Sequence, residues 1–336
     1  SHTMDFINFT INSSREIKNK FKLKSGLQGD FRKIKSNDRG NHSDYHFGGY
    51  LMGVYKSNNM VFTAIAREDY DQNYGFEFCP QLSASYSMNN IVLRASAGKS
   101  IRAADYTERY VSNNIVELTP ERSLGNPNLV AEKGWSEEIG INYYPFKNIL
   151  FKATAFSRQS KNIIDYILTN ESDIGNVSDI GSLYPGADYF FAKNIKDVYV
   201  NGLELELNTK FIISENKTLG WQIGYTFTDI SNDNLGIYLS SFAKHLFNSQ
   251  IILKYNSLQF SISTLYKERK QQLAESISST LESNYALLNG RIGYEIKNGV
   301  YFNIQILNIT NTDYQNILGA KMPGRWLMGG FRWTFQ

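Results

Sequence analysis

Long apolar segments are missing from this 336-residue sequence, and no run approaches the roughly 20 apolar residues that a membrane-spanning helix needs. Cys79 is the single cysteine, which excludes an internal disulfide and a multi-cysteine metal site. A lone cysteine is typically a small strand hydrophobe rather than a nucleophile. The net charge of +3 comes without a basic run, so no nucleic-acid partner is indicated. These absences argue against a helical membrane protein, a disulfide-stabilised domain and a nucleic-acid-binding protein.

Tyrosine and phenylalanine are abundant instead, with 22 and 21 residues against 4 tryptophans. Both suit β-strands and the aromatic girdles of membrane β-barrels. Apolar and polar residues alternate with a period of two along about fifteen segments, most of roughly 8–12 residues, which is the length of a tilted membrane strand. The predicted strands are Phe6–Ile11, Phe21–Phe31, Tyr45–Tyr55, Met60–Arg67, Tyr74–Tyr86, Ile91–Ile101, Trp135–Tyr144, Ile149–Arg158, Val198–Phe211, Leu219–Phe227, Leu246–Tyr255, Leu258–Tyr266, Tyr285–Ile296, Val300–Leu307 and Trp326–Phe335.

The two faces of these segments differ in chemistry. Leu203, Leu205 and Leu207 share one face of a predicted strand, whereas Glu204 and Glu206 share the other. Carboxylates inside a dry core without partners would be unfavourable, but they are well tolerated against water. The pattern favours an antiparallel barrel wall with lipid outside and a wet lumen inside. A soluble sandwich with these faces inverted is the alternative.

The connections alternate between short and long. Short turns are predicted at residues 57–59, 88–90, 145–148, 256–257 and 297–299, and long connections at about 102–134, 159–197, 228–245, 267–284 and 308–325. This order is typical of outer-membrane barrels, whose periplasmic turns are short and whose external loops are long. In the final segment Phe331, Trp333 and Phe335 alternate with polar residues, which suits a lipid-facing closing strand.

Three motifs resemble those of TonB-dependent outer-membrane receptors. They are Gly98-Lys99-Ser100-Ile101-Arg102-Ala103, with Ala103 where the family has proline; Leu124-Gly125-Asn126-Pro127-Asn128-Leu129 with Glu132 and Glu138-Ile139-Gly140; and Leu307-Asn308-Ile309-Thr310-Asn311 with Tyr314 and Met322-Pro323-Gly324-Arg325. Gln336 follows Phe335, whereas the family's closing strand normally ends on an aromatic residue. We interpret Asn126, Pro127, Gly324 and Arg325 as residues that set strand entry rather than as ligand contacts.

The segment from Asn162 to Ile167, with Ala192–Ile195 and Val200–Glu204, is similar to the vitamin B12 receptor group and related siderophore receptors. The resemblance implies active uptake of a scarce metal chelate, corrinoid or ferric siderophore, powered through TonB, without a cofactor or a catalytic site. A passive porin or an adhesin barrel is the alternative function. An outer-membrane hydrolase is a weaker alternative, because His2, His42, His46 and His245 form no recognisable catalytic motif.

Receptors of this family have an N-terminal plug domain and a barrel of about 22 strands. The resemblance therefore identifies residues 1–336 as the C-terminal part of such a barrel, without the plug. Counting back from the last strand, Phe6–Ile11 corresponds to the eighth strand of the family, and Ser1–Met4 is predicted to lie in an external loop. We expect a separate N-terminal fragment to carry the plug, the first strands and the contact with TonB. An independent barrel of roughly 14–16 strands is the alternative.

The expected substrate contacts are aromatic and cationic residues of two long external loops, because aromatic surfaces flanked by cations suit a flat or anionic chelate. The candidates are Arg102, Tyr106, Arg109 and Tyr110 in the first loop, and Tyr184, Tyr189, Phe190 and Phe191, beside Lys193, in the second. These residues could instead brace the loops or belong to an interface girdle. Asp173, Asp179 and Asp188 are spaced too irregularly for a recognised calcium site, so no metal is predicted. A surface lipoprotein is a further candidate partner.

Overall fold

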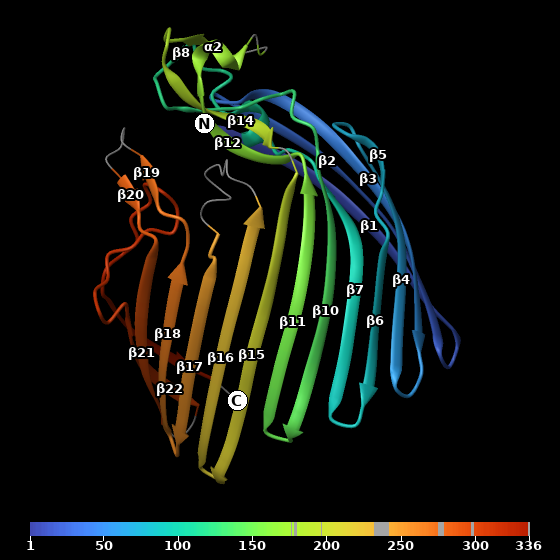
Figure 1. The fold of residues 1–336 in the computed structure, drawn as a ribbon, viewed down its shortest axis with the longest axis vertical. Helices are drawn as coiled ribbons and strands as arrows, with labels where there is room; N and C mark the ends of the chain where they lie inside the picture. Colours follow the sequence, from blue (N-terminus) through green and yellow to red (C-terminus); the bar gives the residue numbers. More distant parts are fainter. Residues whose placement is uncertain are drawn as a thin grey trace.

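The computed structural model describes residues 1–175, 177, 180–195, 197–231, 242–274, 279–296 and 299–334. Its main feature is one antiparallel sheet in which fifteen strands pair in chain order, and a sixteenth, β5, pairs with β4 (Figure 1). The fifteen are β1 (His2–Lys18), β2 (Phe21–Ser36), β3 (Gly40–Lys56), β4 (Met60–Asp71), β6 (Gln81–Met88), β7 (Ile91–Arg102), β10 (Glu132–Phe146), β11 (Ile149–Lys161), β15 (Val198–Ser214), β16 (Lys217–Ser231), β17 (His245–Tyr255), β18 (Leu258–Glu268), β21 (Asn284–Ile296), β22 (Val300–Leu307) and β23 (Trp326–Trp333). The predicted strands are confirmed in number and order.

Cross-strand register keeps the two faces of this sheet chemically separate. Leu203 pairs with Ala155 and Phe227 on one face, and Glu204 pairs with Thr154 and Thr226 on the other. We call these the apolar face and the polar face. Apolar side chains remain accessible, with Ile139 66% and Leu205 42% exposed, because no second sheet covers them in the described chain. The single-layer wall confirms the predicted all-β barrel architecture, and the inverted-sandwich alternative is wrong.

Turns and loops gather at opposite ends of the wall, which we call the turn end and the loop end (Figure 1). At the turn end, two residues join β10 to β11, β15 to β16 and β17 to β18. The described part of the predicted turn at residues 297–299 is Gly299, because Lys297 and Asn298 lie outside the described residues, as does Phe335. No helix in the described ranges is long and apolar enough to cross a membrane.

Several strand boundaries near the N-terminus differ from prediction. β1 begins at His2, so the expectation that residues 1–4 form a loop is wrong; His2 to Met4 pair with Ser36 to Ile34. β2 and β3 likewise continue beyond Phe31 and before Tyr45, and only residues 37–39 connect them. Polar residues in these extensions hide the strand pattern, because strand ends beyond the apolar band have water on both faces.

The predicted strand Tyr74–Tyr86 is divided in two. β5 (Gly75–Phe78) and β6 both pair with β4, and Cys79 and Pro80 lie between them. Pro80 has no N–H for the ladder. Cys79 still donates its backbone N–H to the Arg67 carbonyl at 2.8 Å, so the two pieces keep a common register along β4.

Gly202 in β15 tests the packing of the polar face. A Cβ at this position would overlap the Phe156 ring and lie 2.5 Å from the Phe227 carbonyl oxygen. We expect Gly202→Val to destabilise the wall by about 1–3 kcal/mol, because the backbone carbonyl cannot move aside cheaply. The measurement is the temperature at which the folded band is lost in a heat-modifiability gel.

Gly329 provides the matched control for this prediction. It lies on the apolar face of β23, and a Cβ there would meet nothing within 4 Å. Gly329→Val should keep the wild-type transition temperature. Equal transitions for both variants would contradict the packing argument.

Candidate ligand-binding site at the loop end

The two longest connections between neighbouring wall strands are residues 103–131 and 162–197. Residues 103–131 and the described part of 162–197 fold together into one body, which we call the loop module. The first contains α1 (Tyr106–Tyr110), β8 (Glu117–Leu118) and β9 (Ser123–Leu124); the second contains β12 (Ile163–Asn170), α2 (Glu171–Ile174), β13 (Ser182–Leu183) and β14 (Asp188–Ile195). β14 pairs with β12 and with β9, and β13 pairs with β8. Strand pairing therefore joins the loops above the wall (Figure 1).

Apolar side chains from both loops form the core of the module. One cluster joins Leu118 and Leu124 of the first loop to Ile174, Tyr189 and Phe191 of the second. Tyr189 has no exposed surface; its hydroxyl donates to the Leu118 carbonyl at 2.9 Å and accepts from the Tyr184 N–H at 2.9 Å. A second cluster contains Ala104, Leu129, Ile164, Tyr166 and Ala192, with Phe190 packed against it.

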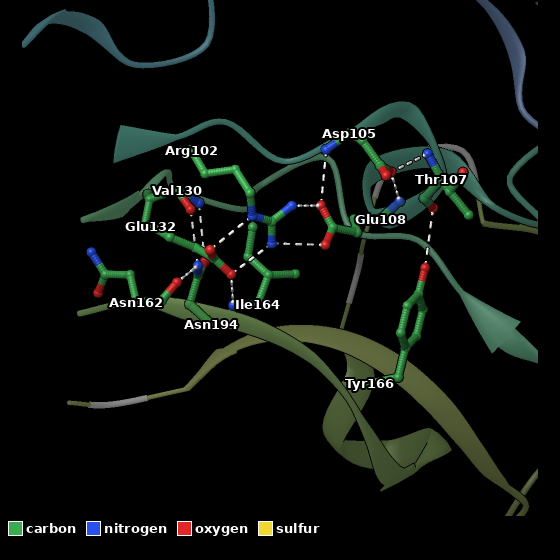
Figure 2. Close-up of polar contacts among 10 residues, drawn as sticks. All are labelled: Arg102, Asp105, Thr107, Glu108, Val130, Glu132, Asn162, Ile164, Tyr166 and Asn194. Carbon is green, nitrogen blue, oxygen red and sulfur yellow. Dashed lines mark hydrogen bonds and ion pairs between the residues drawn. The ribbon is translucent and has the colours of Figure 1, made fainter. Parts of the chain in front are cut away.

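Arg102 fastens the module to the wall (Figure 2). At the end of β7, its guanidinium donates two hydrogen bonds of 2.9 Å to Glu108 in α1. It donates two more, of 2.8 and 2.6 Å, to Glu132 at the start of β10. Planar guanidinium groups suit such paired carboxylate contacts. Arg102 thus has structural partners on both sides, and its contact with a ligand stays a prediction.

The same cluster holds the second loop. Glu132 also accepts a hydrogen bond of 2.7 Å from the Ile164 N–H. Asn194 donates to the carbonyls of Val130 and Asn162 at 2.9 and 2.7 Å (Figure 2). Because Glu132 bonds to both the β7 arginine and the β12 backbone, one carboxylate links the two loop bases. We call Arg102, Glu108 and Glu132 the clasp.

The tip of the β2–β3 hairpin supports the module from the polar side of the wall. The Tyr106 hydroxyl donates to the Arg32 carbonyl at 3.1 Å. Its pKa is raised, mainly by burial and to a smaller extent by the nearby Asp44 carboxylate. The Tyr110 ring stacks on His42 with centroids 3.5 Å apart and planes 5° apart. Asn114 adds hydrogen bonds to the backbone of residues 37 and 38. Tyr106 therefore braces the module against the hairpin, and its contact with a ligand stays a prediction.

A charged network lies on the polar face below the hairpin tip. His46 of β3 is 3.3 Å from Asp30 of β2 and 3.0 Å from Asp69 of β4, and Arg67 pairs with Asp69 at 2.6 Å. These contacts join three strands through buried side chains. Within the described ranges, no group of three or more His, Cys, Asp or Glu residues could hold a metal ion. Asp179 lies outside the described residues.

The predicted contact residues divide into two groups. Arg102, Tyr106, Tyr189 and Phe191 hold the fold together, and the last two are buried in the module core. Arg109, Tyr110, Tyr184 and Phe190 keep exposed or half-buried surface. Arg109 and Tyr110 are side by side, with the guanidinium carbon 5.2 Å from the ring centroid, whereas Tyr184 and Phe190 belong to the other loop.

Sequence reasoning missed residues beside this Arg109–Tyr110 pair. His42 stacks on Tyr110. The oxygen and nitrogen of the Asn113 side-chain amide are buried without hydrogen-bond partners, and so is the Arg109 Nε. His42 lies on the polar face of β3 together with Asp44 and His46, because every second residue of a strand faces the same side. This alternation in the sequence could have assigned His42 to that face. Asn113 had no sequence signal, since its position depends on how the first loop folds.

The motifs that were interpreted as strand-entry devices do serve this purpose. The Asn126 side chain accepts from the Asn128 N–H at 3.0 Å and donates to the Ala192 carbonyl at 3.0 Å. Arg325 donates its Nε–H to the Ile309 carbonyl at 2.9 Å just before β23. Both sets of contacts lie within the polypeptide, and they direct the chain into β10 and β23.

Comparison with known proteins identifies the family. The family model described as TonB dependent receptor-like, beta-barrel, matches residues 6–311. The chain belongs to this family. It is an outer-membrane β-barrel sequence, and its motif resemblance is confirmed.

Individual relatives are distant in sequence but similar in fold. The Vitamin B12 transporter BtuB of Photobacterium profundum is 21% identical over 273 residues, covering 79% of this chain and 39% of the relative. The siderophore receptor PirA of Pseudomonas aeruginosa has a TM-score of 0.72 at 16% identity, covering 98% of this chain and 56% of that one. PirA of Acinetobacter baumannii has a TM-score of 0.74 at 15% identity, with coverage of 99% and 55%. The chain thus spans about half or less of each of these three relatives.

Arg102→Ala should loosen the loop module without unfolding the wall. Loss of the guanidinium leaves the buried Glu108 carboxylate without its two strongest hydrogen bonds, which are worth about 1.5–3 kcal/mol each as bonds to charged groups. We expect amide hydrogen exchange in residues 103–131 and 162–170 to accelerate roughly tenfold or more, while β15 and β16 keep their protection.

Lys321→Ala is the control for the clasp. Lys321 forms an ion pair of 3.3 Å with Asp313, and both side chains are largely exposed. Such exposed ion pairs contribute little to folding stability. Unchanged exchange in the module of Arg102→Ala, or an equal acceleration in Lys321→Ala, would contradict the role given to Arg102.

Proposed function

We propose that the chain is the C-terminal barrel portion of a receptor that takes up a metal chelate, vitamin B12 or a ferric siderophore, with energy supplied through TonB. Family membership combined with a folded loop module at the loop end carries this proposal. A passive pore needs a wall and a lumen, but it has no need of two long loops fastened to each other and to the wall. No catalytic role is proposed.

The binding surface that we propose centres on Arg109 and Tyr110. Their half-buried side chains combine a cation with an aromatic face. The guanidinium is held in place by hydrogen bonds to the Asn73 side chain and to the Pro127 carbonyl. Tyr184, Phe190 and Lys193 of the second loop contribute further half-buried or exposed surface. A flat or anionic chelate can use these groups for stacking, cation–π contact and hydrogen bonding.

Titration of the membrane-extracted receptor with cyanocobalamin and, separately, with ferric enterobactin tests the substrate class. We expect saturable quenching of tryptophan fluorescence by one of the two. Arg109→Ala/Tyr110→Ala should raise the Kd of that chelate about tenfold, as expected for loss of an aromatic and cationic anchor. Failure of both chelates to bind would contradict the proposed substrate class.

A second cation–aromatic pair supplies the matched control. Lys217 and Tyr255 lie at the turn end of the wall, with the ammonium nitrogen 5.9 Å from the ring centroid. Lys217→Ala/Tyr255→Ala removes the same two kinds of group far from the module and should leave the Kd unchanged. Steady ion conductance in a planar bilayer, without chelate binding, would favour the passive-pore alternative.

We further propose that an N-terminal fragment completes the barrel and carries the plug that contacts TonB. β1 and β23 are the two edges of the described sheet, and an unpaired strand edge in lipid is strongly unfavourable. The chain's coverage of 54–56% of the solved receptors is consistent with a missing remainder. Purified receptor should show a second polypeptide on a denaturing gel; one band near 38.4 kDa without a partner would contradict this.

A further inference from the structure

Three side chains form a stacked group on the polar face near the turn end. Tyr301 of β22 lies between two guanidinium groups: the Arg291 carbon of β21 is 5.8 Å from the ring centroid, and the Arg332 carbon of β23 is 5.3 Å from it. We call Arg291, Tyr301 and Arg332 the cationic platform. Tyr301 pairs in register with Arg332 and with Glu295, so all of them share the polar face.

Gly293 allows the Tyr301 ring of the platform to lie close to the sheet. A Cβ at Gly293 would overlap the Tyr301 hydroxyl and lie 2.6 Å from the ring carbon that bears it. The absence of a side chain lets the tyrosine ring lie across β21 instead of standing upright. The result is a shallow, flat surface with a guanidinium group on either side.

Positive charge is in excess on these three strands, because Glu295, opposite Tyr301 on the same face, offsets only one of the two arginines within the described chain. Neither Arg291 nor Arg332 takes part in an ion pair there, and β21, β22 and β23 carry one acidic residue, Glu295. The Arg291 Nε is buried without a hydrogen-bond partner, whereas Arg332 is exposed. By contrast, Arg32, Arg67 and Arg102 all pair with carboxylates.

Position separates the platform from the chelate surface. The platform lies toward Gly299, at the end of β21 and β22 opposite the loop module. Figure 1 shows these two ends of the wall. Its polar face is directed away from lipid, because Phe302, Phe331 and Trp333 occupy the other face of the same strands. An occupant of the platform must therefore lie against the inside of the wall near its turn end.

We propose that the cationic platform docks an acidic polypeptide segment carrying at least two carboxylates, supplied by the N-terminal fragment. This inference rests on the proposed function, which introduces that fragment. Guanidinium forks bind carboxylates with paired hydrogen bonds, and the flat Tyr301 ring offers apolar contact between them. Two arginines without ion pairs, against one carboxylate on the same face, favour this acidic segment over a neutral or basic one.

A photoreactive amino acid placed beside the platform can be cross-linked to the segment that binds there, which identifies that segment. Met328 lies on the polar face of β23, four residues before Arg332, so Met328→p-benzoylphenylalanine leaves both arginines in place. In outer membranes, irradiation should link this position to a segment of the N-terminal fragment that contains two or more Asp or Glu residues. Leu327→p-benzoylphenylalanine, on the apolar face, should link to lipid or to the neighbouring barrel strand and not to the acidic segment.

Charge removal supplies the second measurement. Arg291→Gln/Arg332→Gln should lower the polypeptide cross-link from position 328 about tenfold and release the fragment at lower NaCl concentration. Arg291→Lys/Arg332→Lys, which keeps charge but loses the fork, should fall between this variant and the native protein, and Lys321→Gln should match the native protein. Heat modifiability of each variant checks that the wall has assembled.

The outcomes separate the two proposals. A retained fragment with native cross-linking and salt resistance in Arg291→Gln/Arg332→Gln overturns the acidic-docking inference alone, as do cross-links only to lipid or to a segment without carboxylates. Absence of any fragment overturns both the inference and the proposed completion of the barrel. Cross-linking to an acidic segment, weakened by loss of the two arginines, supports the inference.

Discussion

Backbone hydrogen bonding in a wall between two solvents is the constraint on which this structure depends. Every N–H and C=O inside lipid needs a partner. Neighbouring strands supply it in register across the described sheet, except along the outer edges of β1 and β23. The same register forces side chains to alternate between lipid and water. Leu205 and Glu206 can therefore be neighbours in sequence without either being misplaced, because they point into different media.

This constraint is local and repetitive, so the wall was predictable from sequence. A period of two identifies β15 from residues 203 to 207 without knowledge of any distant contact. Prediction failed where pairing extends beyond lipid, as at His2 to Met4, and where Pro80 interrupts a run of strand-forming residues. In the first case the alternation of apolar and polar residues is weak. In the second case the alternation does not reveal that Pro80 lacks a backbone N–H.

The candidate site was less predictable, because its geometry comes from contacts between distant segments. Tyr189 and Phe191 have the composition of a binding surface, yet Leu118 and Leu124 cover them from the other loop. Arg102 resembles an anion-binding residue until Glu108 and Glu132 are brought to it by the folding of residues 103–131. Composition pointed to these two loops, but long-range packing decided which of their aromatic and cationic groups remain accessible.

The pairing of β9 with β14 limits how the loop module can change in evolution. Insertions in most external loops alter one connection and leave its neighbours intact. Here a change near residues 123–124 also removes the partner of Phe190 and Phe191, so the two loops must be altered together. New ligand preferences would therefore arise more easily from single exposed side chains on a preserved module than from replacement of either loop.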